Sequence, residues 1–160
     1  MCVFDVIKAR RSIRKYTSDQ ISDEDLKDLL KAAMAAPSAG NKQPWEFVAI
    51  RDRDILNTAV SIHPSGGYNM LSHAPLAIVV CGNPNRELYK GIWTQDCAAA
   101  TENILIAAQF LGLGAVWLGV YPWEDRVAKL KKLLGLPDKI IPLSIVSVGH
   151  PAEKLSLIHI

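Results

Sequence analysis

Residues 94–111 read TQDCAAATENILIAAQFL and predict one long helix at the centre of the fold. Apolar residues occupy most of its circumference, whereas Gln95, Glu102 and Gln109 recur at every seventh position and fall on one narrow stripe. Acidic and amide side chains interrupt the apolar run, so the helix is not a membrane span. We expect it to be buried on nearly all sides, either in the core of one chain or between a sheet and a twofold partner.

The rest of the chain alternates helices with short strands, and no repeat or long linker divides it. It therefore predicts one domain of mixed α and β structure. Ser22 is placed to cap a helix that Pro37 terminates, and Gly135 to close another. We expect helices at residues 3–11, 22–36, 53–60 and 124–134, and strands at 47–50, 76–81, 115–120 and 141–148.

Composition limits the classes of partner. A chain of 160 residues with 49% hydrophobic content is generous in apolar surface for a small monomer, so we expect part of it to be buried against a second copy. The net charge of +2 is too small for a surface that recognises nucleic acid or membranes. We therefore expect neither of those partners.

Cysteine and histidine usage argues against disulfides and metals. Cys2, Cys81 and Cys97 are odd in number and show no C-x-x-C spacing, which is typical of a reducing cytoplasm. We interpret Cys81 and Cys97 as small core residues rather than nucleophiles. The four histidines have no metal-ligand spacing, so we predict no metal site. The first residues lack a basic leader and a long apolar stretch, so we expect a cytoplasmic location.

Two N-terminal motifs carry complementary chemistry. In the first, Arg10-Arg11-Ser12-Ile13-Arg14, three guanidiniums and a hydroxyl could surround a phosphate; an isolated cluster of this kind is more often solvated surface charge. The second, Pro37-SAGNKQP-Trp45, offers neutral side chains that donate and accept, which suits the polar edge of a flat ring. Together the motifs predict one ligand with a phosphate and a ring.

The sequence does not indicate a dinucleotide-binding fold. Gly112-x-Gly114 follows a predicted helix and precedes a predicted strand, the reverse of the G-x-G-x-x-G context, and no G-K-[ST] phosphate loop is present. A separate nicotinamide domain is therefore not expected.

The two motifs, with residues 112–119 (GLGAVWLG) and 148–153 (VGHPAE), resemble the FMN-dependent nitroreductases, in particular their short, single-domain members. The resemblance covers residues 3 to 153. It implies an α+β fold with a nitroreductase-like mixed sheet flanked by helices, a long central helix, and a homodimer with its sites at the interface. We assign residues 1–154 to this FMN-binding domain; residues 155–160 form an atypical apolar tail where relatives continue.

The resemblance also implies roles for individual residues. Arg10, Arg11 and Ser12 would lie at the FMN phosphate and Arg14 at the pyrimidine edge of the ring. The second loop would reach the cofactor of the partner subunit through Pro37, Ser38, Asn41 and Gln43. The backbone of Trp117, Leu118 and Gly119 would lie near the reactive face, and the candidates for the substrate pocket are Tyr68, Asn69 and Trp93. No side chain is predicted to be catalytic, because the flavin carries the chemistry.

The expected activity is an NAD(P)H oxidoreductase with ping-pong hydride transfer to small molecules such as nitroaromatics, quinones or similar electrophiles. Alternatives are a non-catalytic flavin- or nucleotide-binding protein, a flavoenzyme similar to the reductive dehalogenases, and a small module that senses anions or binds nucleic acid. The physiological acceptor and the choice between NADH and NADPH are not readable from these motifs.

Overall fold

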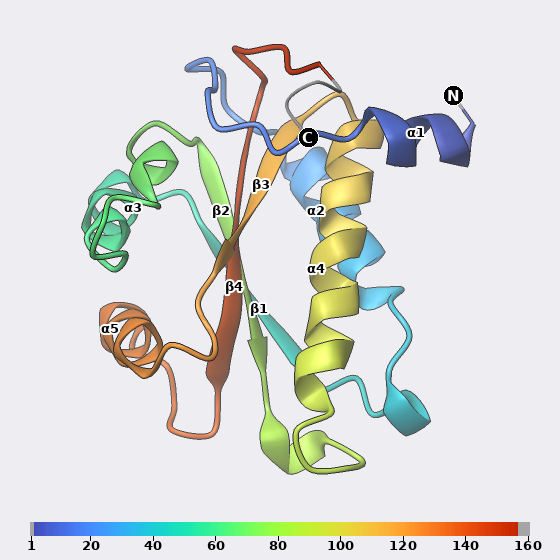
Figure 1. Ribbon diagram of the computed structural model, residues 1–160, viewed down its shortest axis with the longest axis vertical. Helices are drawn as coiled ribbons and strands as arrows, with labels where there is room; N and C mark the ends of the chain where they lie inside the picture. Colours follow the sequence, from blue (N-terminus) through green and yellow to red (C-terminus); the bar gives the residue numbers. More distant parts are fainter. Residues whose placement is uncertain (1, 157–160) are drawn as a thin grey trace.

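The computed structural model, which describes residues 2–156, has three layers (Figure 1). A four-stranded sheet lies in the middle. Helices α2 (Asp23–Met34) and α4 (Trp93–Phe110) cover one face, and α3 (Arg53–Val60) and α5 (Glu124–Leu134) cover the other. Helix α1 (Val3–Ala9) projects beyond one end of α4. Three short 3₁₀ helices are η1 (Ala39–Asn41), η2 (Asn69–Ser72) and η3 (Pro84–Arg86).

The strands are β1 (Trp45–Ile50), β2 (Leu76–Gly82), β3 (Gly114–Gly119) and β4 (Ile141–Gly149). They lie in the order β1-β2-β4-β3, and every pair is antiparallel. The expected α+β fold is confirmed. The parallel component expected of a mixed sheet is reduced, among the described residues, to one isolated bridge between Ser12 and Ala115. Because β3 is an edge strand, this bridge lies on its outer edge.

Local signals account for most element boundaries. The Ser22 hydroxyl accepts the Asp25 N–H at 3.0 Å and begins α2, and Gly135 ends α5 with a left-handed φ of 61°. Helix α1 ends at Ala9, two residues before the predicted end, because Arg10 adopts an extended backbone. The Arg11 guanidinium then donates to the carbonyl groups of Lys8 and Arg10, both at 2.7 Å.

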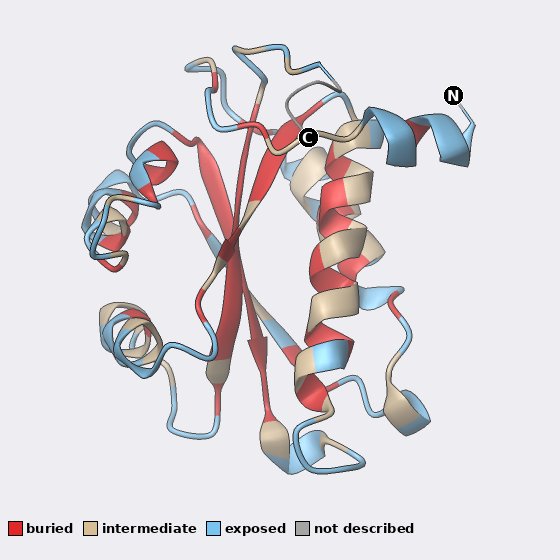
Figure 2. Cartoon of the chain, in the orientation of Figure 1, coloured by how far each residue is buried: buried red, intermediate tan, exposed pale blue. Residues whose placement is uncertain are grey.

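Helix α4 packs its buried side on the sheet, with Cys97, Ala100, Ile104 and Ala108 fully buried (Figure 2). A polar contact on this side joins the hydroxyls of Thr101 and Ser144 at 3.0 Å. The rest of its surface is half-buried, and Phe110 is 62% exposed. Within one chain, α4 is therefore not buried on all sides, and the remainder of its surface is open to a partner.

Cys81 and Cys97 are fully buried, and Cys97 Sγ lies 3.5 Å from the Cys81 carbonyl oxygen. Burial raises the pKa of each thiol to about 12. The interpretation of both as core residues is confirmed.

We predict that a thiol reagent such as DTNB modifies only the exposed Cys2 in the native protein and all three cysteines in urea. Since folding raises both pKa values, the stability contributed by the protonated thiols is fully present below about pH 9 and is lost as the pH rises toward 12. Urea titrations between pH 7 and 11 measure this loss. Rapid reaction of three thiols without denaturant would contradict the prediction.

Candidate functional site

The segment Arg10–Arg14 lies along the outer edge of β3. The Ile13 N–H donates to the Ala115 carbonyl at 3.1 Å, and Ser12 forms the parallel bridge to the same residue. The close approach requires Gly114, because a Cβ there would lie 2.7 Å from the Ile13 side chain. The first motif is thus fixed to the beginning of an edge strand.

The end of the same strand is fixed differently. The Gly119 carbonyl accepts hydrogen bonds from the Tyr68 hydroxyl and from Arg126 Nη1, the latter at 3.1 Å. Burial raises the pKa of Tyr68, so its hydroxyl remains a donor at neutral pH. Tyr68 precedes η2 and therefore connects η2 to the end of β3.

Between these two points the outer edge of β3 is free. Backbone groups alternate along a strand, so those of Trp117 face the same edge as those of Ala115 and Gly119. The N–H and C=O of Trp117 on that edge have no hydrogen-bond partner among residues 2–156. A donor and an acceptor side by side match a ring edge that carries amide and carbonyl groups. The side chain of Leu118 is buried, which fixes this part of the strand to the core.

The three arginines of the first motif have different environments. Arg10 Nε lies 3.9 Å from the Glu102 carboxylate, and the exposed Arg14 donates from Nη1 to the Ser12 carbonyl at 3.0 Å. Arg11 Nε is buried and has no hydrogen-bond partner among the described residues. A buried N–H without a partner costs about 1–3 kcal/mol, and an anionic oxygen would remove that cost. This donor therefore fits a phosphate group.

Glu153 holds the position of Arg14. Its Oε1 accepts the N–H groups of Arg14 at 2.6 Å and Lys15 at 3.2 Å. The strand-like pairing continues with the Ala152 N–H donating to the Lys15 carbonyl at 2.9 Å, and with the bridge between Tyr16 and Pro151. The sequence motif of residues 148–153 does not by itself predict this role for the Glu153 carboxylate. The tail predicted at 155–160 is described only to Ser156, with Leu155 packed against the core; residues 157–160 lie outside the described part.

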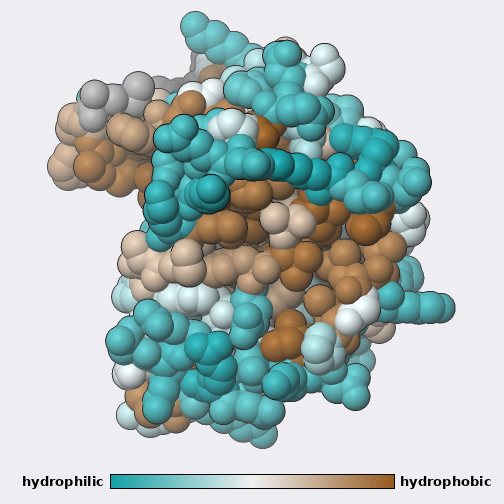
Figure 3. All heavy atoms as spheres, turned by 180° about the vertical axis from the view of Figure 1, so that it is seen from behind, coloured by the Kyte–Doolittle hydropathy of each residue, from teal (hydrophilic) through white to brown (hydrophobic). Residues whose placement is uncertain are grey.

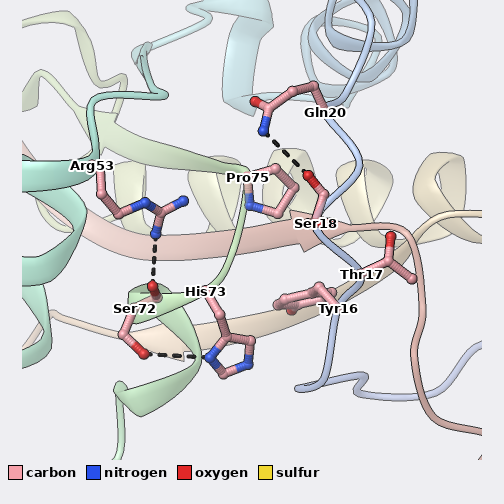
Figure 4. A pocket seen from close by; sticks show the side chains of 8 residues that line it. All are labelled: Tyr16, Thr17, Ser18, Gln20, Arg53, Ser72, His73 and Pro75. Atoms are coloured by element: carbon pink, nitrogen blue, oxygen red, sulfur yellow. Dashed lines mark hydrogen bonds between the residues drawn. The ribbon is translucent and has the colours of Figure 1, made fainter.

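A polar pocket of about 380 Å³ lies beside this segment (Figure 4). On one side His73 Nε2 lies 3.0 Å from the Arg14 carbonyl oxygen. The Tyr16 hydroxyl contacts Ser147 Oγ at 2.6 Å, and burial raises the pKa of this phenol well above its usual range. Arg53 donates to the carbonyl groups of Leu71, Ser72 and Ala74. These contacts connect η2 to the first motif and so position Arg14 relative to Tyr68.

The second motif lies at the other end of α4 (Figure 1). Asp96, in the first turn of α4, is buried and its Oδ1 accepts the Ala39 N–H at 3.0 Å. Ser38 Oγ accepts the Gln43 N–H at 3.0 Å, and positive φ angles of 55° and 46° turn Asn41 and Gln43 outward, where both are exposed. Pro37 is exposed as well. The 18-residue α4 is about 27 Å long. A single chain therefore does not bring the two motifs together.

The predicted substrate-pocket residues divide into two groups. Asn69 is exposed at the start of η2. Tyr68 and Trp93 are 2% and 4% exposed and belong to the core in this chain. Trp93 packs under Gly82, where a Cβ would lie 2.1 Å from its ring. The aromatic surface near the end of β3 comes instead from two residues that sequence reasoning missed, Tyr121 and Trp123, which are 40% and 48% exposed.

Two further findings concern metals and membranes. Among residues 2–156 no three His, Cys, Asp or Glu side chains lie close enough to hold a metal ion. In the same range no helix has the length and apolar content needed to cross a bilayer.

Comparison with known proteins identifies the family. The sequence model of the nitroreductase family matches residues 7–74 and 57–150, which together span most of the chain. The chain belongs to the nitroreductase family.

Relatives match this chain over nearly its whole length. A protein of Archaeoglobus fulgidus with the provisional name NADH dehydrogenase/NAD(P)H nitroreductase is 53% identical over 150 residues, covering 93% of this chain and 85% of the relative. A crystal structure of a provisional NADH oxidase from Clostridium acetobutylicum superposes with a TM-score of 0.88 at 42% identity, covering 98% and 97% of the two chains. A provisional nitroreductase from Desulfovibrio desulfuricans, solved in complex with FMN, has a TM-score of 0.81 at 30% identity, covering 99% and 94%.

We predict that Glu153→Ala accelerates amide hydrogen exchange at Arg14 and Lys15, because both N–H groups lose their acceptor. The cost in the free energy of unfolding is about 0.5–1.5 kcal/mol, because both N–H groups are exposed and water can replace the lost acceptor. Glu153→Gln is the matched control, since its amide oxygen still accepts. Exchange measured by NMR that is equally fast in both variants, or unchanged in Glu153→Ala, would contradict the role given to this carboxylate.

Proposed function

We propose that this protein is an FMN-dependent NAD(P)H oxidoreductase that works as a homodimer. The observation that carries the proposal is the free outer edge of β3 at Trp117, which lies between the arginine-bearing segment at Ser12 and the anchored carbonyl at Gly119. A phosphate would be held at one end of this edge and a polar ring along it. The nitroreductase family membership, and a relative solved with FMN, support the same reading.

Several residues of this chain would bind the cofactor along this edge. Arg10, Arg11 and Ser12 would bind the phosphate, with the unpartnered Arg11 Nε as a donor. The exposed Arg14 would place its charge at the pyrimidine side, where a cation favours the reduced, negatively charged ring. The Trp117 backbone would pair with the ring edge, and the buried Leu118 keeps that backbone in place.

When bound, FMN would accept a hydride from NAD(P)H and then pass two electrons to a second molecule in a ping-pong sequence. A nitroaromatic would take up these electrons with two protons and become a nitroso compound and water, and a quinone would become a hydroquinone. The chain itself contributes binding, orientation and exclusion of water. No side chain is assigned as acid or base.

A partner subunit would complete the site. A groove of about 390 Å³ between α1, α2 and α4 is lined mostly by apolar residues, and Val3, Phe4 and Phe110 beside it are 62–70% exposed. Figure 3 shows apolar surface on the projecting α1 and in a band across the molecule seen from behind. Surface of this kind favours a protein interface. Across a twofold axis the exposed loop of one chain, with Pro37, Ser38, Asn41 and Gln43, would reach the β3 edge of the other.

The location we propose is the cytoplasm. The buried thiols of Cys81 and Cys97 are unpaired, which suits a reducing compartment.

We predict that the purified protein saturated with FMN is yellow, that NAD(P)H bleaches it without oxygen, and that a nitroaromatic restores the colour. Visible absorbance measures all three steps. Colour that NAD(P)H does not bleach would leave a flavin-binding protein without this activity, and failure to bind FMN would end the proposal.

A shared site predicts complementation between two defective chains. Arg14→Ala and Asn41→Ala should each lose FMN binding in their own homodimers. Co-expressed with two different tags, they should form mixed dimers in which one of the two sites has both native residues, so that about half of the sites in the doubly purified dimer bind again. FMN fluorescence of the doubly purified dimer measures this. Circular dichroism checks that each variant is folded, and a mixed dimer without FMN would place both motifs in the site of one chain.

A further inference from the structure

An aromatic and cationic surface flanks the end of β3, and none of the roles above uses it. Trp123 lies directly over Gly119, where a Cβ would be 3.1 Å from its six-membered ring. Tyr121 meets the buried Trp93 edge-on, with 5.1 Å between ring centroids. Gly119 is two residues from Trp117, about 7 Å along the strand. The exposed ring of Trp123 is therefore adjacent to the free edge.

Arg126 stacks on this ring. Its guanidinium carbon lies 4.1 Å from the Trp123 centroid, and Nη1 donates to the Gly119 carbonyl at 3.1 Å. That bond uses one of five N–H donors. Of the acidic residues beside Arg126 in α5, Asp125 lies 3.7 Å from Lys129, and no carboxylate of residues 2–156 is within 4.0 Å of Arg126. Arg126 is thus a half-buried cation whose charge is not neutralised by the described chain.

We propose that Trp123 and Arg126 form the acceptor subsite and select flat aromatic acceptors that carry a carboxylate. The proposal rests on the proposed function, because it takes the free edge at Trp117 as the place of the redox ring. Trp123 offers a plane for any aromatic ring, which by itself does not discriminate by charge. Arg126 adds the discrimination, since a stacked guanidinium is weakly hydrated and binds a carboxylate through two parallel N–H donors.

Two contacts restrain the Arg126 guanidinium. The bond to Gly119 holds one end of the guanidinium at the strand edge, and the Trp123 ring holds its plane. A planar donor held at two points loses little freedom on binding. A lysine at position 126 would keep the positive charge but would lack the planar set of donors.

The first test is binding, measured by NMR on the protein with and without FMN. The probes are benzoate and benzamide, which have the same shape and differ in charge, and the signal is the Trp123 indole N–H. We expect benzoate to bind more tightly. Arg126→Gln should weaken benzoate binding by about fivefold, the upper range for a partly exposed ion pair, and change benzamide binding by less than about twofold.

Matched variants separate the effect of the charge on binding from an effect on folding. Lys132→Gln removes the same charge from the same helix, about 9 Å along its axis, and should leave both affinities unchanged. Arg126→Lys should keep part of the preference for benzoate. Trp123→Leu should weaken the binding of both ligands alike. Because this variant lacks the indole N–H, its binding is measured from the resonances of the ligand. Equal effects of Arg126→Gln on benzoate and benzamide would overturn the proposal.

The second test uses turnover of 4-nitrobenzoate and 4-nitrobenzamide by the FMN-loaded protein. Arg126→Gln should lower kcat/KM for 4-nitrobenzoate by about fivefold through KM, and change kcat/KM for 4-nitrobenzamide by less than about twofold. A rise in the KM for NAD(P)H instead would assign the cation to the phosphate of the donor and overturn the acceptor role. If NAD(P)H does not reduce the protein at all, the proposed function fails, and the benzoate measurement still decides whether this subsite exists.

Discussion

The outer edge of β3 is the feature on which the rest of the site depends. An edge strand exposes a row of backbone donors and acceptors, and proteins usually cover or pair them. Here the beginning of the strand is paired with Ser12 and Ile13, and its end is satisfied by Tyr68 and Arg126. Between them, the backbone N–H and C=O of Trp117 have no partner among residues 2–156. This free donor and acceptor match a ring edge that carries amide and carbonyl groups.

Residues far apart in the sequence keep this edge in shape. The Arg14 backbone is held by Glu153, 139 positions later, and its carbonyl is contacted by His73 from the η2 region. The same region supplies Tyr68 to the other end of β3. The site is therefore supported by three separate segments that meet only when the sheet has formed. This arrangement ties the integrity of the site to the global fold, because no single segment carries the geometry.

Helix α4 also keeps two parts of the candidate site apart. It separates the arginine-bearing motif from the loop of Ser38 to Gln43, which Asp96 holds at the helix N-terminus. A site that uses both motifs needs two chains, and the half-buried outer side of α4 beside an apolar groove is where a second chain would pack. The second oxygen of this carboxylate, Asp96 Oδ2, is buried and has no hydrogen-bond partner among the described residues.

Periodicity and capping residues determined the local structure. The helix that begins after Ser22, the helix that ends at Gly135, and the strands could be predicted from the sequence. Tyr68 and Trp93 could not be placed, because an aromatic residue next to a loop has the same local pattern whether it faces ligand or core. The contacts of Arg126 with Gly119 and Trp123 could not be predicted, because an arginine among the charged residues of α5 has the pattern of solvated surface. The tertiary structure alone decided which backbone groups stay free and which motifs stay apart, since hydrogen-bond satisfaction and distance across the fold depend on packing between segments far apart in the chain.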